Sequence, residues 1–187
     1  MAQIYVVGHK NPDNDSIMAA YTYANLKNMT DSENTYVPVR LGELPAESAM
    51  LFDEYGIEPP ALIERVGEGD VLVLVDHNEM GQAVDGIEDA EVAEIIDHHR
   101  IADVSTSAPI TFINLPWGST TSIITKLYEY FGITTDEQIA ACLLSAILTD
   151  TVILKSPTAT ETDARHVEKL ATVLDLSLIH ISEPTRL

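Results

Sequence analysis

The five residues from Val71 to Val75 are all valine or leucine, and this run constrains the fold more than any other feature of the chain. A strand without a polar face must be covered on both faces, which is typical of the inner strands of a parallel sheet. Other short runs of this kind are separated from it by polar loops and by helical patterns. We expect strands at residues 4–7, 36–41, 71–75, 94–96 and 110–113.

Helical patterns alternate with these strands along most of the chain. We expect helices at residues 17–26, 45–55, 120–130, 136–148 and 160–174, with Ser119 or Thr120, Asp136 and Thr160 as N-caps. This alternation predicts an α/β fold with a parallel β-sheet flanked by helices on both faces. Ligands of such folds bind beyond the carboxyl ends of the strands. The length of 187 residues suits one ordinary domain.

The chain is strongly acidic, with 10 Lys and Arg against 30 Asp and Glu and a net charge of -20. Such a surface repels phosphate backbones and anionic lipid, which disfavours nucleic acid and membrane as partners. The first apolar run has no basic leader and no apolar stretch reaches ~20 residues, so we expect a cytoplasmic protein. The single cysteine, Cys142, lies in an apolar run and is expected in the core.

Acidic and histidine side chains follow three of the expected strands. His9, Asp13 and Asp15 follow residues 4–7, Asp76 and His77 follow residues 71–75, and Asp97, His98 and His99 follow residues 94–96. A further acid, Asp150, ends an apolar helix, where the helix dipole disfavours a negative charge and where a functional reason is therefore indicated. Because the carboxyl ends of parallel strands lie side by side, we expect these groups to converge.

Carboxylates gathered in this number raise one another's pKa values unless divalent cations compensate their charge. Histidine nitrogens with carboxylate oxygens suit Mn²⁺, Co²⁺, Fe²⁺ or Zn²⁺. The excess of oxygen donors without thiolates favours Mn²⁺ or Mg²⁺, and the histidines favour Mn²⁺. Two such ions about 3.5–4 Å apart can bind both the attacking and the leaving oxygen of a phosphoryl displacement. The residues therefore indicate metal-assisted hydrolysis of a phosphoester or a phosphoanhydride.

Several of these residues also have simpler structural explanations. Residues 11–15 are typical of turns and helix caps, although acids and histidines at three strand ends exceed what capping requires. His77 and Asp97 either orient neighbouring ligands or point into the core. His166 is expected on a solvated helix face. Residues 118–121 either cap the helix that follows or offer backbone N–H groups to a phosphate.

Four motifs occur in order: Gly-His-Lys-Asn-Pro-Asp-Asn-Asp-Ser at residues 8–16, Val-Asp-His-Asn at 75–78, Asp-His-His at 97–99 and Asp-Thr at 150–151. Together they resemble the motifs of family II, manganese-dependent inorganic pyrophosphatases, which belong to the DHH phosphoesterase superfamily. The resemblance implies an N-terminal α/β domain that carries the metal ligands. It also implies a smaller C-terminal domain with basic substrate-binding residues and an active site in the cleft between the two.

The resemblance further implies roles for individual residues. His9 and Asp13 would bind one Mn²⁺, Asp15, His98 and Asp150 would bind the other, and Asp76 would bridge them. His99 would contact the substrate phosphate and donate a proton to the leaving group. The nucleophile would be a water or hydroxide between the ions, and pyrophosphate would enter with Mg²⁺. The implied assembly is a homodimer formed through the N-terminal domain.

The end of the chain departs from this family. We expect residues 1–176 to form the DHH metal-binding domain and residues 177–187 to be a tail that fits no element. The family's Ser-Arg-Lys-Lys-Gln motif and second domain are absent, so we expect a truncated gene product with a foreign end from about residue 178.

Two alternatives remain open at this point. One is another DHH phosphoesterase, either an oligonucleotide phosphodiesterase or an exopolyphosphatase, and the other is a folded but inactive fragment. Asn14 stands where the nuclease relatives usually have glycine, and the acidic surface is poorly suited to a nucleic-acid backbone. Both observations favour pyrophosphate over nucleic acid as the substrate.

Overall fold

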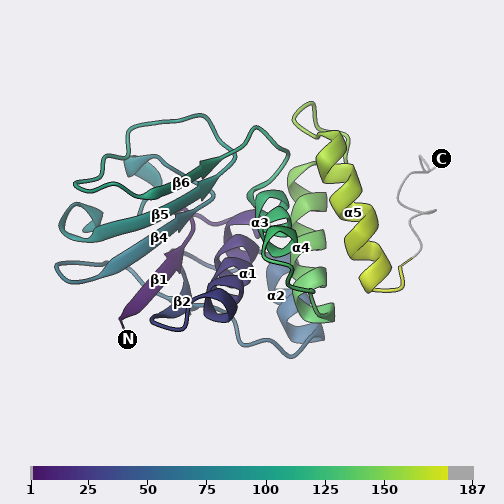
Figure 1. The fold of residues 1–187 in the computed structure, drawn as a ribbon, viewed down its shortest axis with the longest axis horizontal. Helices are drawn as coiled ribbons and strands as arrows, with labels where there is room; N and C mark the ends of the chain where they lie inside the picture. The colour runs from purple at the N-terminus through teal and green to yellow at the C-terminus, as the bar shows by residue number, and fades with distance from the viewer. Residues whose placement is uncertain (1, 177–187) are drawn as a thin grey trace.

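A six-stranded sheet organises the structure, a computed structural model that describes residues 2–176 (Figure 1). Its strands are β1 (Gln3–Val7), β2 (Thr35–Arg40), β3 (Ala61–Leu62), β4 (Val71–Val75), β5 (Glu91–Asp97) and β6 (Thr111–Asn114). They lie in the order β3-β2-β1-β4-β5-β6, and every neighbouring pair is parallel. The predicted α/β fold with a parallel sheet is confirmed, and β3 is an additional edge strand that the sequence pattern does not indicate.

The α-helices follow the predicted pattern closely. They are α1 (Asn14–Thr30), α2 (Ala46–Glu54), α3 (Thr120–Tyr130), α4 (Glu137–Asp150) and α5 (Glu161–Val173). Ser119, Asp136 and Thr160 cap α3, α4 and α5, because each side chain accepts a hydrogen bond from a backbone N–H of the first turn. The first helix begins earlier than expected, at Asn14, because Asp13 is its N-cap.

The two faces of the sheet are covered by different elements. Val73 and Val75 of β4 belong to a core cluster with residues of α1, α3, α4 and α5, whereas Leu72 and Leu74 belong to a second cluster. This second cluster includes residues of two 3-10 helices, η1 (Met80–Gln82) and η2 (Ile87–Asp89), and of the loop between these two helices. Figure 1 shows the labelled α-helices on one side of the sheet. Helices flank both faces as predicted, but the second face carries 3-10 helices and loops.

The direction in which the chain crosses the sheet explains this division. From β1 the chain proceeds to β2 and β3, and from β4 it proceeds in the opposite direction to β5 and β6. Because connections between parallel strands are right-handed, opposite directions place the connections on opposite faces. Helices α1 and α2 form the first set of connections, and residues 76–90 and 98–110 form the second. The order of the strands reverses between β1 and β4, and ligands of open α/β sheets bind at such a switch point.

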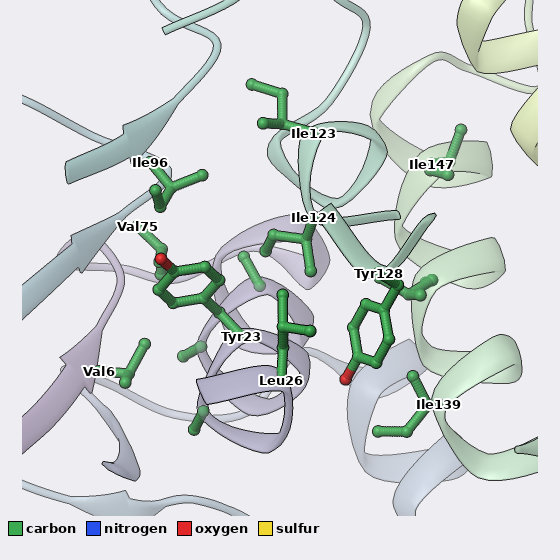
Figure 2. Packing of buried hydrophobic residues seen from close by; sticks show 14 of the residues in the cluster. Val6, Tyr23, Leu26, Val75, Ile96, Ile123, Ile124, Tyr128, Ile139 and Ile147 are labelled. Carbon is green, nitrogen blue, oxygen red and sulfur yellow. The ribbon is translucent and has the colours of Figure 1, made fainter. Parts of the chain in front are cut away.

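The main core lies between the sheet and the α-helices (Figure 2). Val6, Val75 and Ile96 face the helices from three neighbouring strands, β1, β4 and β5. The buried Tyr128 of α3 donates a hydrogen bond from its hydroxyl to the carbonyl oxygen of Thr22 in α1, at 2.8 Å. This bond satisfies the only polar atom of the tyrosine side chain. The packing holds the first turns of α1 and α3 next to the carboxyl ends of the strands.

Burial decides two expectations about single residues. Cys142 is fully buried as predicted, and this burial raises the pKa of its thiol to about 12. The expectation for His166 is wrong, because only 4% of this residue is exposed. Its Nδ1 lies 2.9 Å from Ser122 Oγ, and its ring packs edge-on against Trp117. Charged neighbours in the sequence suggest a solvated face, but His166 lies on the face that contacts α3.

In the part of the chain that the structure describes, no helix has both the length and the apolar character needed to cross a membrane. The predicted tail at residues 177–187 lies outside the described residues.

Candidate metal centre

The turn between β1 and α1 brings three of the predicted site residues to the carboxyl end of the sheet. Gly8 permits a close approach there, because a Cβ atom at this position would lie 1.9 Å from Ser16 Oγ. The same hydroxyl accepts a hydrogen bond from His9 N at 3.0 Å. Asp13 caps α1 through Oδ1, which accepts from Ser16 N at 2.9 Å. Its Oδ2 lies toward His9, and Asp15 follows in the first turn of the helix.

Strands β4 and β5 and the end of α4 supply the other residues. Asp76 directly follows β4 and has a φ of 63°, which is uncommon for a residue with a side chain. Its N–H donates to the carbonyl oxygen of Ile96 at 3.0 Å, which holds this sharp turn against β5. His98 and His99 follow β5, and Asp150 is the last residue of α4.

Asp76 lies between two histidines that come from different strands. Its Oδ2 is 3.5 Å from His9 Nε2, and its Oδ1 is 3.5 Å from His98 Nε2. Asp13 Oδ2 lies 3.6 Å from the same nitrogen of His9. Asp150 Oδ2 lies 3.4 Å from the same nitrogen of His98. The two oxygens of Asp76 therefore face two separate His–Asp pairs.

Three overlapping groups of side chains within residues 2–176 bring potential ligand atoms to within 4.8 Å of one another. They are Asp76 with His98 and His99, His9 with Asp13 and Asp76, and Asp15 with His98 and Asp150. Because Asp76 and His98 each occur twice, the groups contain seven residues. These are the seven residues for which the sequence predicts a role at the site. The structure brings them together, and the part that each plays stays a prediction.

Backbone carbonyl groups fix the orientation of both histidine rings. Nδ1 of His9 lies 2.9 Å from the carbonyl oxygen of Lys10, and Nδ1 of His98 lies 3.0 Å from that of Trp117. Because a carbonyl oxygen can only accept, each Nδ1 carries the proton and donates it. In both residues Nε2 is therefore the atom that faces the carboxylates. This arrangement is typical of histidines that bind a metal through Nε2.

The carboxylates perturb the pKa values of both histidines. Burial opposes the protonated form of His9, but hydrogen bonds with Asp13 and Asp76 outweigh it and raise the pKa to about 11. Burial likewise opposes protonation of His98, whereas Asp76 and Asp15 raise its pKa, which lies at about 10. Without a bound cation, the carboxylates therefore favour the protonated, positively charged form of both rings.

The acids of the site divide into two kinds. Burial favours the neutral form of Asp76, but its contacts with the two protonated histidines outweigh burial and hold its pKa below the usual range. Burial raises the pKa of Asp15 well above its usual value, and the charges of Asp76 and Asp150 add to this effect. Burial also raises the pKa of Asp150, to about 6. The positive charge of the histidines is therefore insufficient for all the carboxylates present.

Asp97 is fully buried and orients His99, the most exposed member of the site. Its Oδ1 accepts from the backbone N–H groups of His98 and His99, at 2.8 and 3.1 Å, and from His99 Nδ1 at 2.9 Å. Its Oδ2 accepts from the side-chain amide of Asn78. Of the two roles left open for Asp97, orientation of a neighbour is the one that these contacts support. His77 is also buried, and it belongs to none of the three groups in the described residues.

The first turn of α3 takes part in the site in a way that the sequence does not reveal. The N–H groups of Thr120 and Thr121 donate to the carboxylate of Asp15, and the Thr120 hydroxyl donates to Asp76. Ser119 caps the helix, so of the two alternatives for residues 118–121 the capping role is confirmed. Threonines at the start of a helix are the available signal, but Asp15 is more than 100 residues away in the sequence and Asp76 is 44 residues away.

These residues fit a divalent cation. Asp150 Oδ2 is buried and has no hydrogen-bond partner among the described residues, although His98 Nε2 is 3.4 Å away. Such an orphaned carboxylate oxygen is costly unless a cation or a proton compensates it. Two histidine nitrogens with several carboxylate oxygens and no thiolate match the ligand preference of Mn²⁺ and similar ions.

Comparison with known proteins agrees with this geometry. A manganese-dependent inorganic pyrophosphatase of Methanothrix thermoacetophila is 46% identical over 170 residues, which are 91% of this chain and 54% of that protein. The crystal structure of a proposed family II inorganic pyrophosphatase of Methanococcus jannaschii has a TM-score of 0.84 and 37% identity. That match covers 93% of this chain and 57% of the other. The chain thus spans about half the length of the curated relatives it matches.

A more distant structure shares the fold alone. An exopolyphosphatase-related protein of Bacteroides fragilis has a TM-score of 0.72 at 18% identity, over 96% of this chain and 54% of that one.

The family model described as "DHH family, N-terminal domain" matches residues 3–147, well over half of the chain. The Asp-His-His sequence at residues 97–99 lies within this match, at the end of β5. On this evidence the chain belongs to the DHH family, and residues 3–147 correspond to its N-terminal domain.

Proposed function

We propose that this chain is the metal-binding part of a manganese-dependent inorganic pyrophosphatase, which hydrolyses pyrophosphate to two phosphates. The observation that carries the proposal is the position of Asp76, whose two oxygens face His9 and His98 at 3.5 Å each. A carboxylate between two His–Asp pairs suits a shared ligand of two cations. The 46% identity to a manganese-dependent pyrophosphatase supports the choice of Mn²⁺ and of substrate.

The groups of side chains described above support one assignment of ligands, in which Asp76 also joins Asp15, His98 and Asp150 because its Oδ1 faces His98. We infer that one Mn²⁺ binds His9, Asp13 and Asp76, and that a second binds Asp15, Asp76, His98 and Asp150. Co²⁺ has a similar ligand preference and is the expected substitute. When bound, two such cations supply positive charge for the phosphate oxygens and lower the pKa of the attacking water.

His99 is the proposed proton donor. Its Nδ1 is occupied by Asp97, and its ring is about half exposed, so Nε2 is the atom that can reach a substrate. The hydrogen bond with Asp97 raises the pKa of His99, although burial partly opposes it, and this favours the protonated form of the ring. From this position His99 would donate a hydrogen bond to a phosphate oxygen and a proton to the departing phosphate.

The remaining half of the relatives' length bears on substrate binding. We propose that residues 1–176 form the DHH metal-binding domain and that basic residues of a further domain hold pyrophosphate, which enters with Mg²⁺. Such basic residues would strengthen the binding of a multiply charged anion, because the described site is dominated by carboxylates. The homodimer and the cytoplasmic location stay predictions.

The test is phosphate release from pyrophosphate by the purified 187-residue chain with Mn²⁺ and Mg²⁺. A dinucleotide and a polyphosphate serve as parallel substrates, and Asp76→Ala serves as the matched inactive variant. Release from pyrophosphate alone, lost in the variant, is the expected result. Release from the dinucleotide or the polyphosphate alone would contradict the proposed substrate and favour another DHH phosphoesterase.

A folded chain that binds Mn²⁺ but releases no phosphate would be an inactive fragment. In that case the same assay is repeated with the part of the Methanothrix relative that the match does not cover, added as a separate chain or fused. Activity that depends on that part would assign substrate binding to it, and continued inactivity would contradict the proposal.

A further inference from the structure

The first turn of α3 binds two carboxylates of the metal centre, although it contains none of the proposed metal ligands. Asp15 and Asp76 are each only 1% exposed, and both lie among the groups of potential metal ligands. Buried carboxylates that lie close together repel each other and move apart unless donors fix them. The donors that fix these two acids come largely from the first turn of α3.

Asp15 is bound through both of its oxygens. Thr120 N donates to Oδ2 at 2.7 Å, and Thr121 N donates to Oδ1 at 3.1 Å. The Thr121 hydroxyl donates to the same Oδ1 at 2.6 Å. These donors lie at the positive end of the helix dipole, which favours a negative charge at this place. Each oxygen of a carboxylate has two lone pairs. Oδ1 accepts two of these bonds and Oδ2 accepts one, so one lone pair of Oδ2 is left for a cation.

Asp76 is bound by the neighbouring threonine. The Thr120 hydroxyl donates to Asp76 Oδ1 at 2.9 Å, on the oxygen that faces His98. Thr120 therefore donates to both acids, from its N–H to Asp15 and from its hydroxyl to Asp76, and so links the positions of the two carboxylates. The turn is itself rigid, since the Ser119 side chain accepts from Ser122 N and Asp163 accepts from Gly118 N at 3.0 Å.

We propose that the hydroxyl groups of Thr120 and Thr121 are positioning groups that orient the carboxylates of Asp76 and Asp15 for the proposed cations. The Thr121 hydroxyl orients Asp15 for the cation that it shares with His98 and Asp150. The Thr120 hydroxyl orients Asp76, which is shared by both cations. This inference rests on the proposed metal site and adds residues that are not ligands. Loss of a partner that orients a metal ligand typically lowers metal affinity about 10–100-fold.

The test compares Mn²⁺ binding to the full chain by calorimetry for the wild type, Thr121→Val and Thr120→Val. Valine keeps the shape of threonine and removes only the hydroxyl donor. Thr125→Val is the matched control, because Thr125 is equally buried on the same helix and donates only to the carbonyl oxygen of Thr121. Thr121→Ser and Thr120→Ser retain the donor and are expected to rescue binding.

We expect Thr121→Val to weaken one of the two ions about 10–100-fold and Thr120→Val to weaken both, while Thr125→Val binds like the wild type. A purely structural role would instead lower the thermal stability of all three valine variants together and leave Mn²⁺ affinity unchanged. Thr121→Ala replaces Thr121→Val if circular dichroism shows that the latter does not fold.

The outcomes separate this inference from the proposed function. Wild-type binding of two Mn²⁺ together with unchanged affinity in both folded valine variants would overturn the positioning role and leave the metal site intact. Failure of the wild type to bind Mn²⁺ would overturn the metal site itself, and the positioning role with it.

Discussion

We expect binding of Mn²⁺ to this chain to release protons even above pH 8, where histidines with an ordinary pKa are already deprotonated. His9 and His98 face the carboxylates through Nε2, and their pKa values lie at about 11 and about 10 in the metal-free protein. A cation that binds Nε2 must displace the proton from the same atom. Protons and cations therefore compete for two defined positions, and metal binding strengthens as the pH rises.

The magnitude follows from the pKa values. At pH 8.5 a histidine with the ordinary pKa of 6.5 is only about 1% protonated, so it would contribute almost no proton. A histidine with a pKa of about 10 is roughly 97% protonated at the same pH. Saturation with two Mn²⁺ at pH 8.5 should thus release about two histidine protons. Below the histidine pKa, the affinity for each ion should increase about tenfold per pH unit.

The assay is calorimetric titration with Mn²⁺ at pH 8.5 in buffers that differ in ionisation enthalpy. The slope of the observed enthalpy against the buffer enthalpy gives the number of protons released. His9→Gln should lower this number by about one, because it removes one displaced proton. His166→Gln is the matched control, since His166 is buried outside the site and burial lowers its pKa.

A proton release near zero at pH 8.5 with two Mn²⁺ bound would refute the reasoning. It would mean that the histidines are neutral in the metal-free chain and that Asp76 does not hold protons on them. An affinity that does not change between pH 7 and pH 8.5 would lead to the same conclusion, independently of the buffer analysis.

Three further outcomes are expected. Asp76→Ala should abolish binding of both ions in a Mn²⁺ titration, and retention of two Mn²⁺ per chain would contradict the bridging assignment. Asp97→Asn should release the fixed ring of His99, which nitrogen NMR of the imidazole detects as a mixture of tautomers, whereas an unchanged spectrum would exclude the orienting role. Ile124→Ala, at a fully buried position of α3, should lower the free energy of unfolding by about 2–5 kcal/mol in a denaturant titration, and a smaller loss would indicate a loosely packed core.

The sequence predicts those strands and helices whose hydrophobic pattern matches the burial of their residues in the fold. Residues 71–75 form β4 with the expected bounds, because an entirely apolar run has no alternative to a central position in the sheet. The two-residue β3 has no such pattern, since Ala61 and Leu62 are exposed and pair only with the end of β2. The local sequence pattern also does not predict which elements cover which face of the sheet, because this depends on the direction in which the chain crosses the sheet.

The site shows the same division between local and tertiary information. The carboxyl ends of β1, β4 and β5 carry acids and histidines that any parallel sheet would bring together, and this is why the sequence alone locates the cluster. The contacts of Thr120 with Asp15 and Asp76 are tertiary, and 105 and 44 residues separate the partners. Threonines in a first helical turn are common, so no local pattern distinguishes these two from ordinary neighbours of a cap.

The electrostatics of the metal-free chain explain how so many acids can be buried together before any cation binds. Helix α3 supplies neutral donors to Asp15, and the two protonated histidines supply positive charge to Asp76. The α3 donors and the histidine protons each bind particular carboxylate oxygens. The remaining positive charge of the site is therefore located at Nε2 of the two histidines. A proton can provide that charge for Asp76, but the raised pKa of Asp150 and its unpartnered Oδ2 show that two protons are not enough for the whole cluster. Cations of charge +2 at the same two places would compensate these carboxylates without protonating any of them, so the balance of charge in this cluster favours the proposed metal site.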